Sequence, residues 1–221
     1  SEKNPADLPW AELGVDTVFE CTGVFRKQED LKKHIEAGAK RVILSAPAKD
    51  EETPSVVHGV NTPDESPEIF DCASCTTNCI TPVVEIIGRR IGIRKAVMTT
   101  IHAYTSTQDI VDGPSKKLRR GRAAACNLVP TTTGAAKATA KALPQYAGKF
   151  DGAAIRTPIP CGSIADMVFL AEKETGAEEV NAVLTEEAGT DRYKGILGVT
   201  DEPLVSSDIL RDTHASIVDL S

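Results

Sequence analysis

Apolar and polar positions in the first third of the chain follow the spacing of alternating strands and helices. Residues 15–21 and 41–45 are short runs rich in apolar residues, which are typical of buried parallel strands. Between them, residues 26–37 have helical spacing, and Gly38 follows as a residue that commonly ends a helix. A strand, a helix and a strand within about 30 residues predict a right-handed parallel unit. The same reasoning predicts two shorter strands, at residues 56–59 and 68–72.

From residue 74 the pattern changes to longer strands mixed with helices. A helix is predicted after residue 75 and up to about residue 90, but Pro82 leaves its first residue open, because proline costs least only at the first helical position. The polar segment 106–130 is longer than most connections, which favours a role in function or contacts. Further strands are predicted at 95–105, 150–157, 164–173, 196–199 and 216–220, and helices at 134–143 and 178–188. We therefore predict two parts, the tail of a parallel α/β domain over residues 1–73 and an α+β domain over residues 74–221.

Composition narrows the function classes. Aromatic residues make up only 4% of the 221 residues, so the core is predicted to consist mainly of Val, Ile, Leu and Ala. The net charge of −7 and the pI of about 5.2 favour an acidic, well-solvated surface, and we expect no nucleic-acid partner. No apolar stretch approaches the ~18 residues of a membrane span, so no membrane contact is expected.

Six cysteines occur without the spacing of a zinc site or a disulfide framework. We therefore expect free thiols, no metal site and a reducing, cytoplasmic compartment. Five of these cysteines lie in strand-like or apolar settings, or one helical turn after the polar turn at residue 75, and are predicted to be packing residues: Cys21, Cys72, Cys79, Cys126 and Cys161.

Cys75 differs from the other five because its neighbours are Ser, Thr and Asn, a poor composition for a core. It stands just before an apolar helical run, and a helix N-terminus lowers a thiol pKa and so favours the nucleophilic thiolate. His102, near the end of a later strand, is the candidate base. The remaining histidines are predicted to be exposed or half-buried polar residues: His34, His58 and His214.

Two further features suggest sites for anions. Thr133 and Gly134 precede a helix, where the threonine either caps the helix or helps to bind an anion, and both roles are compatible. Arg156 lies within an apolar strand, where a guanidinium is costly unless it meets a ligand anion or a carboxylate. The sequence leaves these two explanations for Arg156 equally open.

The chain resembles the phosphorylating glyceraldehyde-3-phosphate dehydrogenases, most specifically in residues 73–79, 99–105 and 127–137, and also in 15–23, 37–47 and 106–122. The resemblance implies a Rossmann-type parallel domain followed by a catalytic domain with a mostly antiparallel sheet. The chain has no Gly-x-Gly-x-x-Gly turn, so we expect the first part of the Rossmann-type domain to be missing, together with the family's C-terminal strand and helix. We also expect this exact chain to bind its cofactor, NAD or NADP, weakly.

The resemblance implies a role for each matching residue. Cys75 is implied as the nucleophile and His102 as its base. Two groups of residues are implied to bind phosphate, and Arg120 is implied to add positive charge to both sites. The phosphate of a phosphorylated aldehyde is implied to contact Thr105 and Arg156. Inorganic phosphate is implied to contact Ser74, Thr76, Thr133 and Gly134. Four residues are implied to line the cofactor pocket: Thr22, Gly23, Phe25 and Ser45. The segment 106–130 resembles a loop that packs against a neighbouring subunit, which implies a homotetramer.

Two alternatives stay open from the sequence. One is a sister dehydrogenase that acts on erythrose 4-phosphate with the same cysteine and histidine. The other is a non-catalytic chain that keeps the fold as a binding or assembly module. One departure from the family pattern, residues 161–166, concerns strands implied to pack between subunits and leaves the chemistry unaffected.

Overall fold

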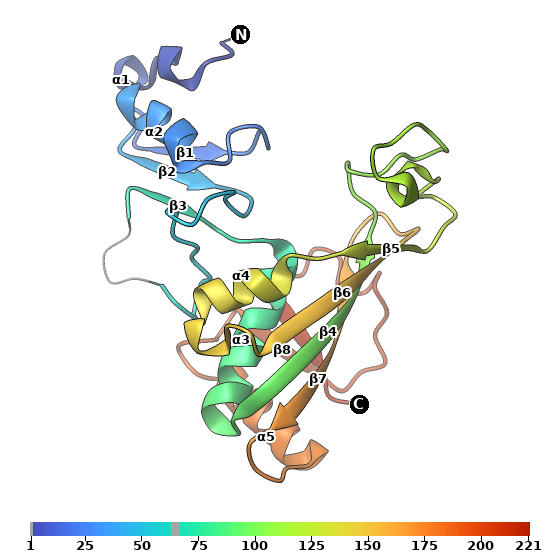
Figure 1. The fold of residues 1–221 in the computed structure, drawn as a ribbon. Helices are drawn as coiled ribbons and strands as arrows, with labels where there is room; N and C mark the ends of the chain where they lie inside the picture. Colours follow the sequence, from blue (N-terminus) through green and yellow to red (C-terminus); the bar gives the residue numbers. More distant parts are fainter. Residues whose placement is uncertain (1, 63–66) are drawn as a thin grey trace.

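The computed structural model describes residues 2–62 and 67–221, which form two lobes joined through a central helix (Figure 1). The first lobe contains a parallel sheet in the order β1-β2-β3, in register from Thr17 opposite Arg41 onward. Its elements are η1 (Pro5–Asp7), α1 (Trp10–Leu13), β1 (Thr17–Glu20), α2 (Gln28–Glu36), β2 (Arg41–Leu44) and β3 (Ile69–Asp71). The predicted strand–helix–strand unit is therefore present.

The core of this lobe explains the local pattern. Leu31 of α2 is fully buried and packs against Val42, Leu44 and Ile69 of the sheet. Gly38 has a φ of 110°, a value that side-chain-bearing residues rarely adopt, and so reverses the chain after α2. The apolar positions of the helix and the strands thus meet on one face of the sheet.

One predicted strand of the first lobe, residues 56–59, is absent. Only Ser55 pairs with the sheet, as a single bridge to Asp71. The chain then turns, because the amides of Val60 and Asn61 both bond to the carbonyl of Val57, and Gly59 takes a φ of 78°. The apolar residues of this segment were a misleading strand signal, since Val57 is buried in a small cluster with Ala73 rather than in a sheet.

The second lobe is built on a four-stranded sheet in the order β5-β6-β4-β7. The outer pairings β5–β6 and β4–β7 are antiparallel, and the central pairing β6–β4 is parallel. A separate parallel pair, β8–β9, packs against the helices α3 and α5. The elements are α3 (Cys75–Arg90), β4 (Ile93–Ala103), η2 (Leu118–Gly121), β5 (Val129–Thr132), α4 (Ala135–Ala142), η3 (Pro144–Tyr146), β6 (Phe150–Thr157), β7 (Ser163–Ala171), α5 (Ala177–Ala188), β8 (Leu197–Thr200) and β9 (Ser216–Asp219). The fold class, α/β followed by α+β, is confirmed.

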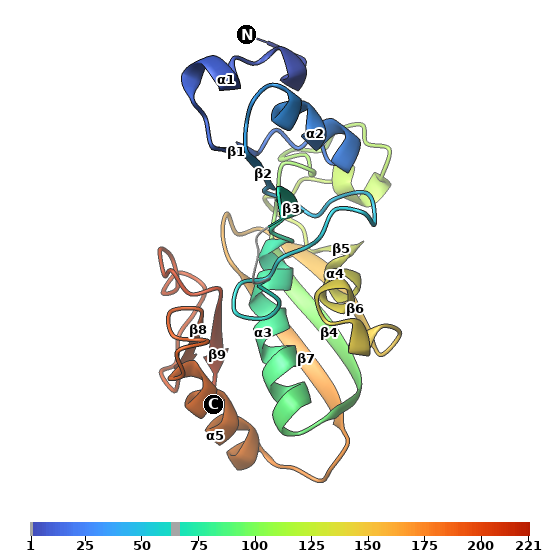
Figure 2. The same ribbon diagram turned by 90° about the vertical axis from the view of Figure 1, so that its left-hand side faces the viewer.

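Helix α3 is the centre of the second lobe. It begins at Cys75 and continues through Pro82, so the proline lies in its interior. Ile80 packs against Met98 of β4 and Ala135 of α4, while α5 and β9 pack against α3 as well (Figures 1 and 2). The helices thus cover one face of the sheet and fix where α3 starts.

The opposite face of the sheet is open and carries several exposed apolar side chains, together with Lys95 and Asp166. Four side chains on it are more than half exposed: Val97, Ile164, Val168 and Leu170. Val97 and Val168 are direct cross-strand partners and Leu170 follows Val168 on the same face, while Asp166 separates Ile164 from them.

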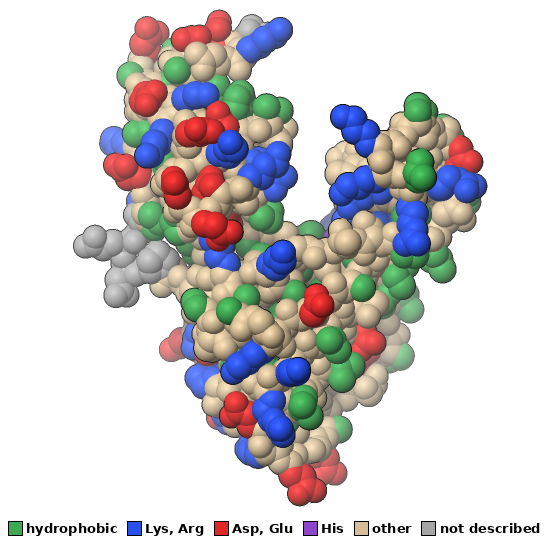
Figure 3. Space-filling view, in the orientation of Figure 1, with side chains coloured by type: hydrophobic (Ala, Val, Ile, Leu, Met, Phe, Trp, Pro, Cys, Tyr) green, Lys and Arg blue, Asp and Glu red, His purple; other side chains and the backbone are tan. Residues whose placement is uncertain are grey.

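The long segment between β4 and β5 forms an arm that extends from the end of the sheet (Figure 1). It is held together internally, because the Asp109 amide bonds to the Arg120 carbonyl and the Gly113 amide to the Gly121 carbonyl. Five of the seven residues 116–122 are Lys or Arg, and basic side chains gather over this arm (Figure 3). A basic arm on an acidic chain shows that charge is distributed unevenly.

Candidate active site

Cys75 lies at the first position of α3, directly after a tight turn. Ser74 is the N-cap, and its Oγ accepts a hydrogen bond from the Thr77 amide at 3.1 Å. Polar residues surround this turn because the free amides of a helix start need acceptors. Cys75 itself is exposed. The sequence prediction of a thiol at a helix N-terminus therefore agrees with the geometry.

His102 reaches the thiol from the end of β4. Its Nε2 lies 3.4 Å from Cys75 Sγ. In the sheet, His102 stands between Arg156 of β6 and Ser163 of β7. The imidazole is thus fixed by the strand register, and the thiol by the start of the helix.

The two groups shift each other's ionisation. The hydrogen bond from His102 lowers the pKa of the Cys75 thiol to about 7, although partial desolvation opposes this, and Thr76 adds a smaller stabilisation of the thiolate. The hydrogen bond to Cys75 raises the pKa of His102, and desolvation opposes that shift too. The lowered thiol pKa and the raised imidazole pKa bring the two groups closer together, which reduces the cost of moving a proton from Cys75 to His102.

Arg156 sits behind the imidazole. Its Nη1 donates to His102 Nδ1 at 2.5 Å and to the Ala103 carbonyl at 2.8 Å. When Nδ1 accepts this bond, the neutral ring carries its proton on Nε2, facing the sulfur. When the ring is doubly protonated, Nδ1 can donate to the Ala103 carbonyl, also 2.8 Å away. Both states of the base are therefore held in one orientation.

Arg156 and Arg120 form a positively charged site. Burial lowers the pKa of Arg156, and the charge of nearby Arg120 lowers it further. Arg120 donates to the hydroxyl of Thr131. Within residues 2–62 and 67–221, neither guanidinium has a carboxylate partner. Of the two explanations for Arg156, the ion pair is thus absent from the described residues, and a ligand anion is favoured.

The other predicted phosphate residues lie around the same end of the sheet. Thr105 follows β4, and its hydroxyl lies 2.9 Å from that of Thr107. Thr76 is buried and turned toward the thiol, which makes it less open to a ligand than Ser74. Strand β5 connects the residues predicted to bind the substrate phosphate with those predicted to bind inorganic phosphate. Its Val129 pairs with Arg156, and the strand leads into the turn that contains Thr133.

The turn before α4 differs from the predicted cap. Gly134, rather than Thr133, is the N-cap residue of α4. The Thr133 hydroxyl instead accepts from the Ala135 amide at 3.1 Å. Gly134 is exposed, so the turn that begins α4 is accessible at this position, as an anion site requires.

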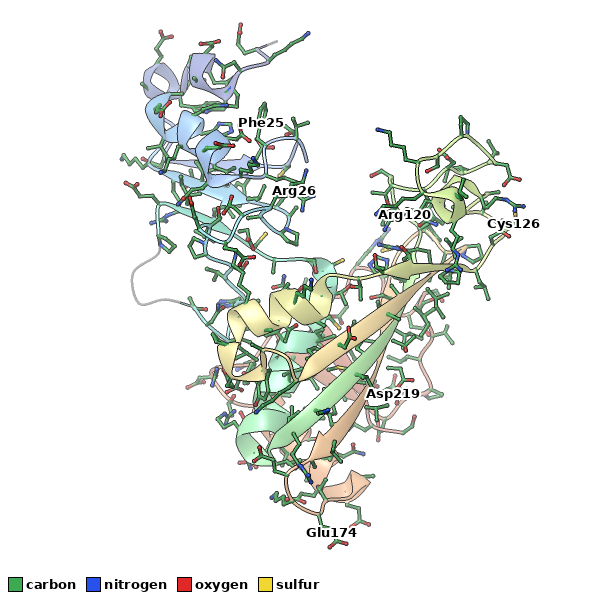
Figure 4. The ribbon with its side chains drawn as sticks, viewed as in Figure 1. Phe25, Arg26, Arg120, Cys126, Glu174 and Asp219 are labelled. Atoms are coloured by element: carbon green, nitrogen blue, oxygen red, sulfur yellow. The ribbon has the colours of Figure 1, made fainter. Side chains whose placement is uncertain are left out.

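The predicted cofactor residues lie at the carboxyl ends of β1 and β2, where parallel sheets commonly bind nucleotides. Gly23 has a φ of 74° and open space around it. Ser45 is exposed, and its hydroxyl bonds to the Glu20 carbonyl. Figure 4 shows Phe25 on the side of the first lobe that faces the arm carrying Arg120. The Thr22 hydroxyl bonds to the Glu20 carboxylate, so Thr22 shapes the turn. These positions fit one side of a nucleotide site.

Several cysteines and one histidine lie elsewhere than predicted. Cys21, Cys126 and Cys161 are exposed because they lie at strand ends or in loops, and so they are not packing residues. His34 is buried rather than on the surface: its ring lies between Trp10 Nε1 at 3.1 Å and Glu20 Oε2 at 3.2 Å. Its partners come from distant positions in the sequence, which helical spacing alone does not reveal.

Two residues that shape the Cys75 turn were not singled out from the sequence. Asn78 Nδ2 donates to the carbonyls of Cys72 and Ser74, and Asp71 accepts from the Ala73 amide. The only sequence signal was a polar residue at each end of the turn. Their roles depend on side-chain directions that the sequence does not specify.

The parts of the chain that the structure describes contain no cluster of His, Cys, Asp or Glu that could hold a metal ion. None of the described helices has the length and apolar character needed to cross a membrane.

Comparison with known proteins identifies the family. Residues 74–221 match the family model described as glyceraldehyde 3-phosphate dehydrogenase, C-terminal domain. Glyceraldehyde-3-phosphate dehydrogenase of Streptomyces coelicolor is 51% identical over 100% of this chain and 66% of its own length. The protein of the same name from Zymomonas mobilis is 47% identical over 99% of this chain and 66% of its own length. That of Mycobacterium tuberculosis (strain H37Rv) is 51% identical over 98% of this chain and 64% of its own length. The chain thus spans slightly less than two thirds of the length of these relatives. The chain belongs to the glyceraldehyde-3-phosphate dehydrogenase family.

Proposed function

We propose that this chain forms the catalytic part of a phosphorylating glyceraldehyde-3-phosphate dehydrogenase. The reaction oxidises a phosphorylated aldehyde with NAD or NADP and converts it to an acyl phosphate with inorganic phosphate. The observation that carries this proposal is the 3.4 Å contact between Cys75 Sγ and His102 Nε2, beside an Arg156 guanidinium without a carboxylate partner in the described residues. The relatives are named glyceraldehyde-3-phosphate dehydrogenases.

The first step is attack of the Cys75 thiolate on the aldehyde carbon. With a thiol pKa of about 7, a large fraction of Cys75 is ionised at neutral pH. The carbon–sulfur bond forms while the carbonyl bond becomes an oxyanion, which the amides at the start of α3, including that of Cys75, can stabilise. The oxyanion then takes the proton that His102 Nε2 carries, which gives the thiohemiacetal hydroxyl and a neutral imidazole. Arg156 and Thr105 hold the substrate phosphate, which fixes the aldehyde beside the sulfur.

The second step removes two electrons from the resulting thiohemiacetal. His102 Nε2 accepts the hydroxyl proton while the carbon loses a hydride and becomes a thioester. NAD or NADP supplies the hydride acceptor when bound, with Thr22, Gly23, Phe25 and Ser45 lining its site. For Nε2 to accept this proton, Nδ1 must carry the ring's other proton and donate it to the Ala103 carbonyl, which also accepts from Arg156. The shared carbonyl thus keeps the imidazole in place during the step.

The third step releases the product. Inorganic phosphate, bound by Ser74, Thr76, Thr133 and Gly134 with Arg120 nearby, attacks the thioester carbon. The carbon–sulfur bond breaks, the acyl phosphate leaves, and Cys75 returns as a thiolate. A thiolate of pKa near 7 is a good leaving group, so the same shift that activates the nucleophile assists its departure.

The open face of the sheet supports assembly with further copies of the chain. Val97, Ile164, Val168 and Leu170 are each more than half exposed on this face, and burial of such side chains against a neighbouring copy would remove apolar surface from water. We infer a homotetramer in which this face and the basic arm contact neighbouring subunits, and a cytoplasmic location for the assembly.

The test uses the gene product that contains this sequence. NADH or NADPH formation is followed with glyceraldehyde 3-phosphate and inorganic phosphate, and iodoacetamide labelling of Cys75 is mapped from pH 5 to pH 9. We expect phosphate-dependent oxidation, and labelling of Cys75 ahead of the other five cysteines. Parallel assays with erythrose 4-phosphate separate the sister activity. If neither phosphate-dependent oxidation nor selective labelling of Cys75 is observed, the proposal is refuted in favour of a non-catalytic module.

A further inference from the structure

Asp71 is a buried carboxylate that the proposed reaction does not use. It ends β3 and is 0% exposed. Its oxygens accept three hydrogen bonds, from the Ala73 amide at 2.8 Å, the Ser55 hydroxyl at 2.8 Å and the Ala48 amide at 3.1 Å. Among the described residues it meets no cation within ion-pair distance. Burying a carboxylate without a cation is costly, and the hydrogen bonds that it accepts from backbone amides indicate that it holds the local backbone in place.

Ala73 has an unusual backbone conformation. Its φ is 55°, in the left-handed region that residues with a side chain rarely adopt, and it is 2% exposed. Such a conformation persists only when neighbouring groups hold it. Asp71 Oδ1 holds the Ala73 amide from one side, and Asn78 Nδ2 holds the carbonyls of Cys72 at 2.8 Å and Ser74 at 2.9 Å from the other. The turn is therefore clamped at three backbone groups.

This turn determines where the nucleophile lies. It redirects the chain from β3 into α3, Ser74 caps the helix, and Cys75 is the first helical residue. His102 approaches from a different element, β4, so the distance between Sγ and Nε2 depends on how the turn aims the helix start. A relaxed Ala73 would change that direction and lengthen the contact.

We propose that Asp71 is a positioning residue for the nucleophile, whose carboxylate holds Ala73 in its left-handed conformation and thereby keeps Cys75 in contact with His102. Through Ala48 and Ser55, the same carboxylate ties the turn to the segment that follows Ser45, one of the proposed cofactor residues. This inference rests on the proposed function, because it assigns Asp71 to the activation of the same thiol.

Iodoacetamide labelling of the 221-residue chain across pH tests the proposal. We expect Asp71→Asn to raise the apparent pKa of the Cys75 thiol from about 7 toward its free value of ~8.5. The labelling rate at pH 6.5 then falls roughly tenfold, because the thiolate is the reactive form. A purely electrostatic role predicts the opposite sign, since removing a negative charge near a thiol lowers its pKa.

A second substitution separates positioning from general damage. Glycine adopts a positive φ without strain, so Ala73→Gly combined with Asp71→Asn should restore most of the labelling rate. Asp219→Asn is the matched control, because Asp219 also ends a strand and accepts the amide two residues on, that of Ser221, but precedes no nucleophile (Figure 4). In the Asp219→Asn variant, iodoacetamide should label Cys75 at the wild-type rate.

Each remaining result has one meaning. A wild-type Cys75 no more reactive than the other cysteines would remove the proposed function and this inference together. A reactive wild type with an unchanged or lowered pKa in Asp71→Asn, or no rescue by Ala73→Gly, would overturn only the inference. If Asp71→Asn fails to fold by circular dichroism, Asn78→Ala opens the clamp from the other side and should raise the Cys75 pKa in the same way.

Discussion

The two ends of helix α3 treat their charged groups in opposite ways. At its start, near Cys75, the arginines Arg120 and Arg156 have no carboxylate partner in the described residues. At its end, Arg89 and Arg90 donate to several carboxylates at 2.6–3.3 Å. Those carboxylates are Glu85, Glu186 and Glu187, and Glu85 also accepts from Arg192 and Tyr193.

The difference shows how one helix serves two purposes. Paired arginines at the C-terminal end satisfy the helix dipole and fasten α3 to α5, so that end is structural. Unpaired arginines at the N-terminal end leave positive charge available for a ligand, and the same end favours a thiolate. Substitutions at the N-terminal end should therefore change catalysis, and substitutions at the C-terminal end should change stability.

Replacing the nucleophile gives the largest effect. Cys75→Ser should lower kcat for aldehyde oxidation by roughly 10⁴-fold or more, because a hydroxyl at this position is not ionised near neutral pH. Cys79→Ser, one turn further along α3, is the control. Burial raises the pKa of the Cys79 thiol, so it contributes no thiolate and its loss should change kcat by less than about twofold. Equal losses in the two variants would end the distinction between the helix start and its interior.

Removing the base comes next. His102→Asn should lower kcat by roughly 10²- to 10⁴-fold. It should also raise the apparent pKa of the Cys75 thiol above about 7, because the hydrogen bond from His102 is the main cause of the lowered value. Labelling that rises between pH 6 and 8 in the wild type would then rise at higher pH. His214→Asn, which removes a half-exposed ring paired with Asp212, should leave both measurements unchanged.

The unpaired arginines should separate into two roles. Arg156→Ala should lower kcat/KM for glyceraldehyde 3-phosphate by roughly 10²-fold or more, since it removes both an anion contact and the bond to His102 Nδ1. It should therefore also slow oxidation of unphosphorylated glyceraldehyde. Arg120→Ala should cost roughly tenfold with the phosphorylated substrate and little with the other. Identical responses to both aldehydes in both variants would contradict an anion site.

Local pattern was sufficient for most elements of the fold. The strand predicted at residues 150–157 is β6, from Phe150 to Thr157, because its alternation and flanking turns act over a few residues. The helix after Cys75 was also predicted, although Pro82 left its first residue open. His102 was a candidate base for Cys75 from residue type alone, and the family resemblance implied the same pair. Their 3.4 Å contact depends on the packing of β4 against α3, which nothing local in the sequence specifies.

The misses share a physical cause, which is dependence on distant partners. His34 lies on a charged helix, yet Trp10 and Glu20 enclose it. The apolar residues 56–59 suggested a strand, but Val57 packs in a small cluster with Ala73 and Ala142. The charge network at the end of α3 joins Glu85 to Tyr193 across more than a hundred residues, so helical spacing within α3 could not reveal it.

Substitutions in the charge network at the C-terminal end of α3 should have the smallest effect on catalysis, and they test whether this end serves stability. Glu187 is 5% exposed, and hydrogen bonds from Arg89, with Arg90 adding to them, hold its pKa below the usual range. Glu187→Gln should lower the free energy of unfolding by about 2 kcal/mol, less than for a fully buried pair because both arginines are partly exposed. Urea midpoints measure this loss, and kcat should change by less than about twofold.

The pH dependence of that loss identifies its origin. Because the folded pKa of Glu187 is lowered, its stabilisation is fully present above the unfolded value of ~4.3 and disappears as pH falls through the folded value. The unfolding curves of the wild type and Glu187→Gln should therefore converge in acid and stay apart at pH 7. Glu174→Gln, an exposed carboxylate on the same lobe, should match the wild type at every pH (Figure 4). A gap that persists at low pH would assign Glu187 to packing, and the contrast between the ends of α3 would then not rest on charge.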